Sequence, residues 1–198
     1  MYNFYFSNNI KTFWFILFGF ILHLIASYFT LGFYNLDEHF KILTPLAKLL
    51  NRENDLISLW EFNSEIMPWL QPYFYYFIAK LTSFISYDDP YVLTLILRSI
   101  SSIIGLLSII YLYNHLKDKF NLDNNFSKLL IFSFWFYAFL HARTSAENLS
   151  ISMLIFGAII FDKLFETKNE NKKLLFAFLS GVFFGLSMVL KYHLVISV

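Results

Sequence analysis

The chain alternates long apolar segments with short polar ones. Residues 13–33 carry no formal charge. At a rise of ~1.5 Å per residue, a helix of this length crosses a hydrocarbon core of roughly 30 Å. Four further apolar segments follow, two of them short enough to be buried half-crossings. We predict about five transmembrane helices, at residues 13–33, 91–113, 126–142, 147–165 and 174–193.

The first apolar segment has an alternative interpretation as a secretory signal peptide. Its apolar run is longer than the apolar region of such a peptide, and no small-residue cleavage site follows it. We therefore interpret residues 13–33 as a retained anchor. His23 lies inside this segment, where we expect a neutral histidine bonded to a neighbouring helix rather than a ligand.

Residues 35–90 predict a long external loop that contains interfacial helices. Apolar residues recur at helical spacing from Phe40 to Leu50, and Pro45 limits the regularity of that helix. Residues 73–85 are rich in aromatic side chains. They fit either a short crossing or a helix lying in the membrane interface.

The distribution of lysine favours the interfacial interpretation. Residues 115–128 and 162–173 are rich in lysine, which predicts that both are cytoplasmic. This sidedness agrees with a cytoplasmic N-terminus, marked by Lys11, only if residues 73–85 do not cross. The loop 35–90 is then external.

Composition agrees with a single all-α, polytopic membrane domain over residues 1–198. Hydrophobic residues make up 58% of the chain and aromatic residues 22%, and the mean hydropathy is +0.55. A net charge of +1 gives no broad basic face for nucleic acid. The absence of cysteine excludes disulfides, thiolate metal sites and a cysteine nucleophile. The chain ends in apolar residues, so we expect a fragment of a longer polytopic protein.

Charged and histidine side chains gather on the external side of this predicted topology. They are Asp37, Glu38, His39, Glu61, Arg98, Arg143, Glu147, Lys191 and His193. Ionisable groups that converge on one membrane face are expected at a functional site.

Asp37 and Glu38 directly follow the first crossing, where a carboxylate can remove a proton from an acceptor hydroxyl. The alternative is that Asp37 caps the following helix. A metal site is disfavoured, because adjacent residues at a helix start cannot all point at one ion. Composition and motifs indicate no cofactor.

Cations and aromatic rings on the same side have two interpretations each. Arg143 can form a fork onto a phosphate, assisted by Lys191 and His193, or Arg143 and Lys191 can extend to the interface. Trp60 and Trp69 can stack on a sugar ring or anchor the chain in the interface.

These residues fall in stretches that resemble the motifs of the lipid-phosphate-mannose-dependent mannosyltransferases. The stretches occur in matching order and spacing: Asp37-Glu38-His39-Phe40, Leu59-Trp60-Glu61-Phe62, Trp69-Leu70-Gln71-Pro72 and Arg143-Thr144-Ser145-Ala146-Glu147-Asn148-Leu149. Gln71 stands where the family motif has histidine. The last stretch has the R-T-x-x-E-N form of bacterial members, and Arg98 matches an arginine early in the second crossing.

The resemblance implies the N-terminal part of a C-type glycosyltransferase fold, with a periplasmic or lumenal active site. It implies inverting transfer of a sugar, expected to be mannose, from a polyprenyl- or dolichyl-phosphate donor to a glycan or glycolipid acceptor. Asp37 would be the catalytic base and Glu38 its neighbour at the acceptor. The expected substrate-binding residues are His39, Trp60, Glu61, Gln71, Arg98, Arg143, Glu147, Lys191 and His193.

Two alternatives remain from the sequence. One is a C-type transferase for another lipid-linked sugar, such as aminoarabinose. The other is a non-enzymatic polytopic protein, although its charges would be expected inside crossings that face a pore. The bacterial-type motif favours the inner membrane of a bacterium, and in a eukaryote the corresponding location is the endoplasmic reticulum membrane. The missing later crossings make activity of this fragment alone doubtful.

Overall fold

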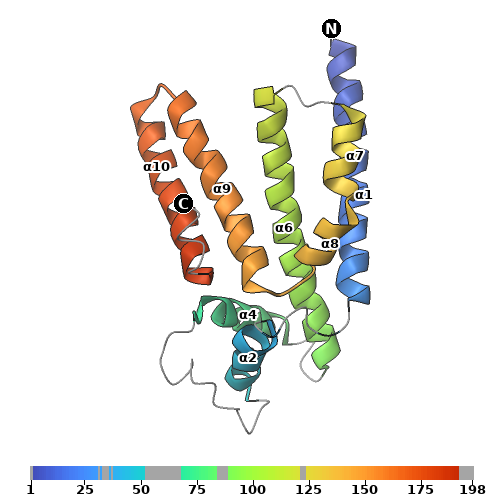
Figure 1. The fold of residues 1–198 in the computed structure, drawn as a ribbon, viewed down its shortest axis with the longest axis vertical. Coiled ribbons are helices and arrows are strands. Elements are labelled where there is room, and N and C mark those ends of the chain that lie inside the picture. Colours follow the sequence, from blue (N-terminus) through green and yellow to red (C-terminus); the bar gives the residue numbers. More distant parts are fainter. Residues whose placement is uncertain are drawn as a thin grey trace.

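The computed structural model describes residues 2–30, 32, 36, 38–51, 68–83, 89–120 and 124–191, and every regular element within these ranges is helical. The long helices run side by side, and two short ones lie across one end of them (Figure 1). In chain order the elements are α1 (Tyr2–Phe29), η1 (Glu38–Leu43), α2 (Thr44–Leu49), α4 (Leu70–Leu81), α6 (Pro90–Phe120), α7 (Asn125–Ser133), α8 (Trp135–His141), α9 (Ala146–Glu166) and α10 (Glu170–Leu190).

Within the described ranges, four helices are long and apolar enough to cross a membrane. They are Thr12–Phe29 of α1, Pro90–Phe120, Ala146–Glu166 and Glu170–Leu190. The all-α, polytopic fold class is therefore confirmed, and the chain is an integral membrane protein.

The segment predicted as a crossing at 126–142 is formed by two short helices, α7 and α8. Phe134 separates them with φ −68° and ψ 109°, which is extended backbone. Nine and seven residues are each too few to span the hydrocarbon core at ~1.5 Å per residue. Both helices pack against α1, so the pair follows the first helix along the bundle (Figure 1). A crossing by the two together stays a prediction.

The two ends of the bundle differ in what they carry. The start of α1, the end of α6, the start of α7 and the α9–α10 turn lie at one end, and α2 and α4 lie at the other (Figure 1). We call these the N-terminal end and the α4 end. The lysines of 115–128 and 162–173 are thus separated from α4, as the predicted sidedness requires.

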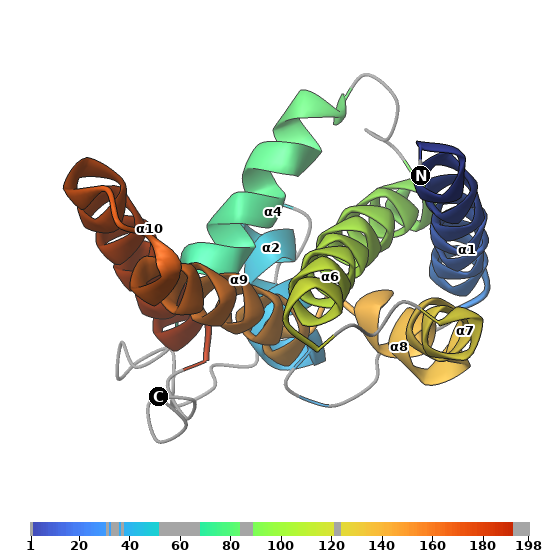
Figure 2. The same cartoon turned by 90° about the horizontal axis from the view of Figure 1, so that it is seen from above.

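Helix α4 lies across the bundle rather than along it, as the view from above shows (Figure 2). Its twelve residues extend ~18 Å, which is shorter than the hydrocarbon core. This orientation favours the interfacial interpretation of residues 73–85. Pairing of α4 with α2 and α6 buries Tyr75 and Leu97, which are 0% and 1% exposed.

A π-helix precedes Pro45 because proline cannot donate the backbone hydrogen bond that a regular helix needs there. The hydroxyl of Thr44 instead reaches back to the carbonyl of His39 at 3.1 Å. The helical stripe from Phe40 to Leu50 therefore forms as η1 followed by α2. This arrangement buries Glu38 and Ile42 on the side that faces the bundle.

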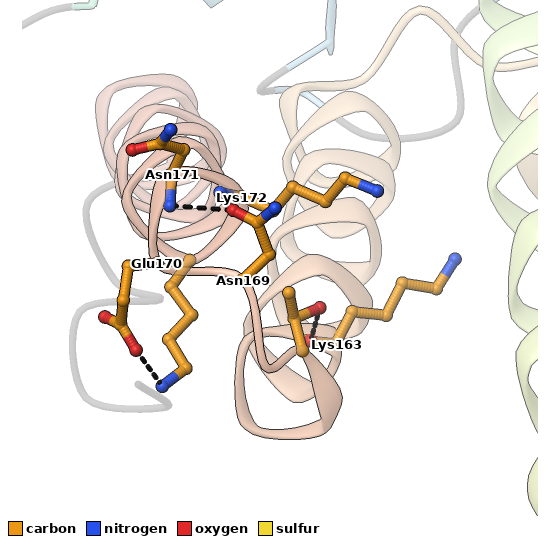
Figure 3. Close-up of polar contacts among 7 residues, drawn as sticks. Lys163, Asn169, Glu170, Asn171 and Lys172 are labelled. Atoms are coloured by element: carbon orange, nitrogen blue, oxygen red, sulfur yellow. Dashed lines mark hydrogen bonds and ion pairs between the residues drawn. The ribbon is translucent and has the colours of Figure 1, made fainter.

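Polar caps close the α9–α10 turn at the N-terminal end (Figure 3). The side chain of Asn169 accepts from the backbone N–H groups of Asn171 and Lys172, at 3.0 and 3.3 Å, which satisfies two donors at the start of α10. Lys163 donates to the hydroxyl of Tyr111 at 3.3 Å and ties α9 to α6. A short turn with capped ends makes α9 and α10 an antiparallel pair.

Candidate active site

The turn between α8 and α9 is the centre of a buried polar network at the α4 end. Thr144 donates to Oε1 of Glu38 twice, from its backbone N–H at 2.9 Å and from its hydroxyl at 2.7 Å. The carbonyl of Thr144 accepts from Nε2 of Gln71 at 2.8 Å. Glu38, Gln71 and Thr144 are each at most 2% exposed, so the turn joins η1 and α4 in the interior.

The turn is held in shape by its own sequence. The side-chain amide of Asn148 donates to the carbonyls of His141 and Arg143, at 2.9 and 3.0 Å. Ser145 caps α9 by accepting from the backbone N–H of Asn148. These bonds orient the Thr144 N–H and carbonyl in opposite directions, toward Glu38 and Gln71.

Gln71 continues the network into α6. It also donates to the hydroxyl of Tyr75 at 3.0 Å, and that hydroxyl lies 2.6 Å from Oγ of Ser101. Ser101 donates to the carbonyl of Leu97, so the Tyr75 hydroxyl is the donor to Ser101. Burial raises the pKa of Tyr75, and the hydroxyl therefore keeps its proton.

Two arginines converge on the backbone that follows α1. Arg98 donates to the carbonyls of Thr30 and Gly32, and Arg143 donates to the same Gly32 carbonyl at 3.2 Å. Both side chains are buried, and Arg143 also lies over the ring of Phe139, 4.7 Å from its centroid. The carboxylate of Glu38 attracts Arg98 electrostatically and offsets the repulsion between the two guanidinium groups.

Gly32 has φ +66°, a conformation in which glycine is favoured because it has no Cβ. The chain turns sharply there, directly after the last turn of α1. This turn presents the Gly32 carbonyl to the arginines.

The predicted base Asp37 lies outside the described residues, as do Trp60, Glu61 and His193. In the sequence, Asp37 directly precedes Glu38 and follows Gly32 by five residues. Both Gly32 and Glu38 are held by the Arg143–Thr144 turn. Gly32 and Glu38, which stand on either side of Asp37 in the sequence, are therefore held by the same turn.

Glu147 and Lys191 form an ion pair beside this network, between the start of α9 and the end of α10. Oε2 of Glu147 is buried and makes no hydrogen bond to a described atom. Glu147 also lines a cavity of about 690 Å³ between α6, α8 and α9, together with Tyr137, His141 and Asn148. The remaining lining is largely apolar, so the cavity has one polar end.

The structure thus brings Glu38, Gln71, Arg98 and Arg143 into one network and pairs Glu147 with Lys191. His39 is half-buried with its ring against Phe40, 4.9 Å between centroids.

Thr144, Asn148, Tyr75 and Ser101 are members of the network that sequence reasoning did not select. Thr144 and Asn148 stood within the quoted R-T-x-x-E-N stretch, which is the signal that could have found them. The spacing of Gln71 and Tyr75, four apart on a helix, could have found Tyr75.

His23 is hydrogen-bonded to a neighbouring helix, as predicted. Its Nδ1 lies 2.7 Å from the carbonyl of Gly19, so this nitrogen is assigned the proton. Its Nε2 then accepts from Nδ1 of His141 at 3.0 Å. The pair joins α1 to α8 next to Gly105, where a Cβ would lie 2.4 Å from the His141 ring.

A helical membrane protein that buries two arginines and a glutamate at one end of its bundle is of the class expected for an integral-membrane transferase. Comparison with protein families gives the particular assignment. The sequence model of the Alg9-like mannosyltransferase family matches residues 14–196, so the chain belongs to that family and is a glycosyltransferase. No curated protein and no solved structure gave a significant match. The resemblance predicted from the four motifs is confirmed, and the non-enzymatic alternative is set aside.

Proposed function

We propose that this protein transfers a mannosyl group from a polyprenyl- or dolichyl-phosphate donor to a hydroxyl of a glycan or glycolipid acceptor, with inversion. One observation carries the proposal. Two arginines hold Gly32 and the Thr144 turn holds Glu38, and these two residues stand on either side of Asp37 in the sequence. Family membership supports mannosyl transfer, and the donor and acceptor classes are part of this proposal.

The proposed chemistry is a single displacement. Asp37 removes the proton of the acceptor hydroxyl, and the acceptor oxygen forms a bond to the anomeric carbon. The bond between that carbon and the phosphate oxygen breaks, and the lipid phosphate leaves with the electron pair. A general base positioned in this way contributes roughly 10²–10⁴-fold to the rate.

The donor phosphate needs cations at the α4 end. Lys191 is the candidate that the geometry favours, because its side chain is 18% exposed at the end of α10. Arg98 and Arg143 donate to backbone carbonyls, so they would act on the phosphate through their charge rather than through direct hydrogen bonds. His193 remains a candidate by its position two residues after Lys191.

The lipid part of the donor has a candidate place in the cavity beside Glu147. Its volume of about 690 Å³ falls within the usual range of about 300–1,000 Å³ for ligand sites. Its largely apolar lining suits an isoprenoid chain.

The sidedness follows from lysine. Lys117, Lys119, Lys168 and Lys172 belong to the N-terminal end of the bundle, so that end is proposed to be cytoplasmic. The α4 end would then face the periplasm of a bacterium, or the lumen of the endoplasmic reticulum in a eukaryote.

A donor panel tests the proposed function. The purified full-length protein is mixed with an acceptor glycolipid and, in separate reactions, polyprenyl-phosphate mannose, polyprenyl-phosphate aminoarabinose or a nucleotide-linked mannose. Transfer from the lipid-phosphate mannose alone is expected. Transfer from the aminoarabinose donor supports the alternative sugar, and transfer from the nucleotide donor contradicts the proposal.

A further inference from the structure

Glu38 is placed in the site as a buried acceptor rather than as a group open to substrate. It is 1% exposed, and its Oε1 receives two hydrogen bonds from one residue, Thr144. A carboxyl oxygen that already accepts an N–H and an O–H in the interior is poorly placed to take a proton from a substrate hydroxyl. Its geometry suits holding the chain in place.

The N–H, the hydroxyl and the carbonyl of Thr144 also all form hydrogen bonds. Its N–H and hydroxyl bind Glu38, and its carbonyl binds Gln71. Asn148 fixes the carbonyls on the N-terminal side of Thr144. The orientation of the Gln71 amide follows from this contact, because its oxygen would repel the Thr144 carbonyl if the amide were reversed. Thr144 is therefore held by α4 and α9 while it holds η1.

The other flank of the Asp37 segment is fixed from the same turn. Arg143 precedes Thr144 and donates to the Gly32 carbonyl, and Arg98 donates to that carbonyl from α6. Gly32 and Glu38 are thus attached to adjacent residues of one turn, Arg143 and Thr144.

We propose that Thr144 and Glu38 are positioning residues, which set the location of the Asp37 carboxylate without touching the substrate. The inference rests on the proposed function, in which Asp37 is the base. A displacement of about 1 Å in a reacting group can lower a rate by about 10²-fold. The two hydrogen bonds to Glu38 should therefore act on kcat rather than on substrate binding.

The test compares Thr144→Val with Thr144→Ser in the full-length protein, assayed with polyprenyl-phosphate mannose. Valine has nearly the shape of threonine and removes only the hydroxyl donor to Glu38. We expect kcat to fall about 10- to 100-fold with KM within about threefold. Thr144→Ser keeps the hydroxyl and should stay within about threefold of the wild type.

Thr94→Val is the matched control at the same end. The Thr94 hydroxyl donates to the Pro90 carbonyl of its own helix at 2.7 Å. Its substitution should leave kcat unchanged. Activities are normalised to folded protein, measured by monodisperse elution in detergent, because a merely structural role would lower the yield and leave the normalised kcat unaltered.

Glu38→Gln provides a second variant that does not depend on Thr144. Glutamine keeps an oxygen that can accept both Thr144 bonds, so this variant should retain kcat within about tenfold. Its pH–rate profile should keep the wild-type shape. A loss of 10²-fold or more together with a changed pH–rate profile, as expected for removal of a proton-transfer group, would overturn the positioning role of Glu38.

The outcomes separate the inference from the function on which it rests. Wild-type transfer from the lipid donor, together with an unchanged normalised kcat in Thr144→Val, overturns the inference alone. Failure of the wild type to use that donor overturns both. Loss in Thr144→Val with rescue by Thr144→Ser supports both.

Discussion

The guanidinium of Arg143 donates to the backbone carbonyl of Gly32, 111 residues earlier in the chain. This bond joins the α8–α9 turn to the exit of the first membrane helix. It is formed in the interior, where Arg143 is 6% exposed and stacked on Phe139. The contact makes the position of Gly32, five residues before the proposed base, depend on Arg143.

Arg143→Lys should therefore lower mannosyl transfer. A lysine ammonium lacks the planar guanidinium that allows arginine to stack on Phe139 and, at the same time, to donate to the Gly32 carbonyl. We expect kcat to fall about tenfold to 10²-fold, from misplacement of the chain by a fraction of an ångström to about 1 Å. The measurement is the initial rate with lipid-phosphate mannose.

Lys173→Met is the control for a removed charge. Lys173 pairs with Glu170 at the N-terminal end, and the two side chains are 39% and 82% exposed. Exposed pairs of this kind contribute little to stability, so the rate should not change. A rate in Arg143→Lys equal to that of this control would contradict the role given to Arg143.

Gly105→Ala should destabilise the protein. A Cβ at this position would lie 2.4 Å from Cγ of His141, so the ring must move and its bond to His23 is strained. Overpacking of this kind costs about 1–3 kcal/mol. Thermal unfolding in detergent measures the effect as a lower Tm.

Gly181→Ala is the matched glycine variant. A Cβ at Gly181 of α10 meets no atom within 4 Å, and alanine is favoured over glycine in a helix by roughly 0.8–1.0 kcal/mol. Its Tm should be equal to or above the wild-type value. Equal Tm values for the two alanine variants would refute the close approach of α6 and α8.

Asn148→Asp should disrupt the α8–α9 turn. The amide donates to two carbonyls, and a carboxylate at that place has no N–H to offer and repels both oxygens. Loss of these donors in a buried site costs about 1–3 kcal/mol. The unfolding midpoint should fall, and kcat should fall with it because Thr144 is displaced.

Asn171→Asp serves as its counterpart on the exposed first turn of α10. A negative charge near a helix N-terminus is mildly favourable, so neither the midpoint nor the rate should fall. An Asn148→Asp variant as stable as Asn171→Asp is incompatible with the hydrogen bonds described.

Lys191→Met should weaken binding of the lipid-phosphate donor while changing the stability of the protein little. The Lys191–Glu147 pair is partly exposed, so its loss should change the unfolding free energy by at most about 1 kcal/mol. If Lys191 contacts the donor phosphate, KM for the lipid-phosphate donor should rise about tenfold while the acceptor KM is unchanged. An unaltered donor KM removes Lys191 from the proposed phosphate site.

The charged members of the network could be selected from the sequence because charge is costly inside a membrane and marks function. Glu38, Arg98 and Arg143 were found in this way, and Gln71 by its motif. Thr144 and Asn148 carry no charge, and their importance comes from where the backbone carbonyls and N–H groups point. That information appears only when the turn is folded.

For the fold as well, the hydrophobic pattern predicted some features, and others depend on how the helices pack. Hydrophobic segments located the long helices well, but α1 begins at Tyr2 and α6 continues to Phe120, because polar residues outside the apolar core still form helix. The break at Phe134 has no proline or glycine to signal it. The contact of His23 with His141 depends on the approach of α1 and α8, which periodicity does not specify.

The most direct measurement is mannosyl transfer by Asp37→Asn in the full-length protein, beside Asp89→Asn. Asp89 is an exposed carboxylate at the same end, and its Oδ1 accepts from the backbone N–H of Tyr91 at 2.8 Å, a role that asparagine can also fill. We predict a loss of about 10²–10⁴-fold in Asp37→Asn and an unchanged rate in Asp89→Asn, with both proteins inserted in the membrane. A wild-type rate in Asp37→Asn would contradict the assignment of the base.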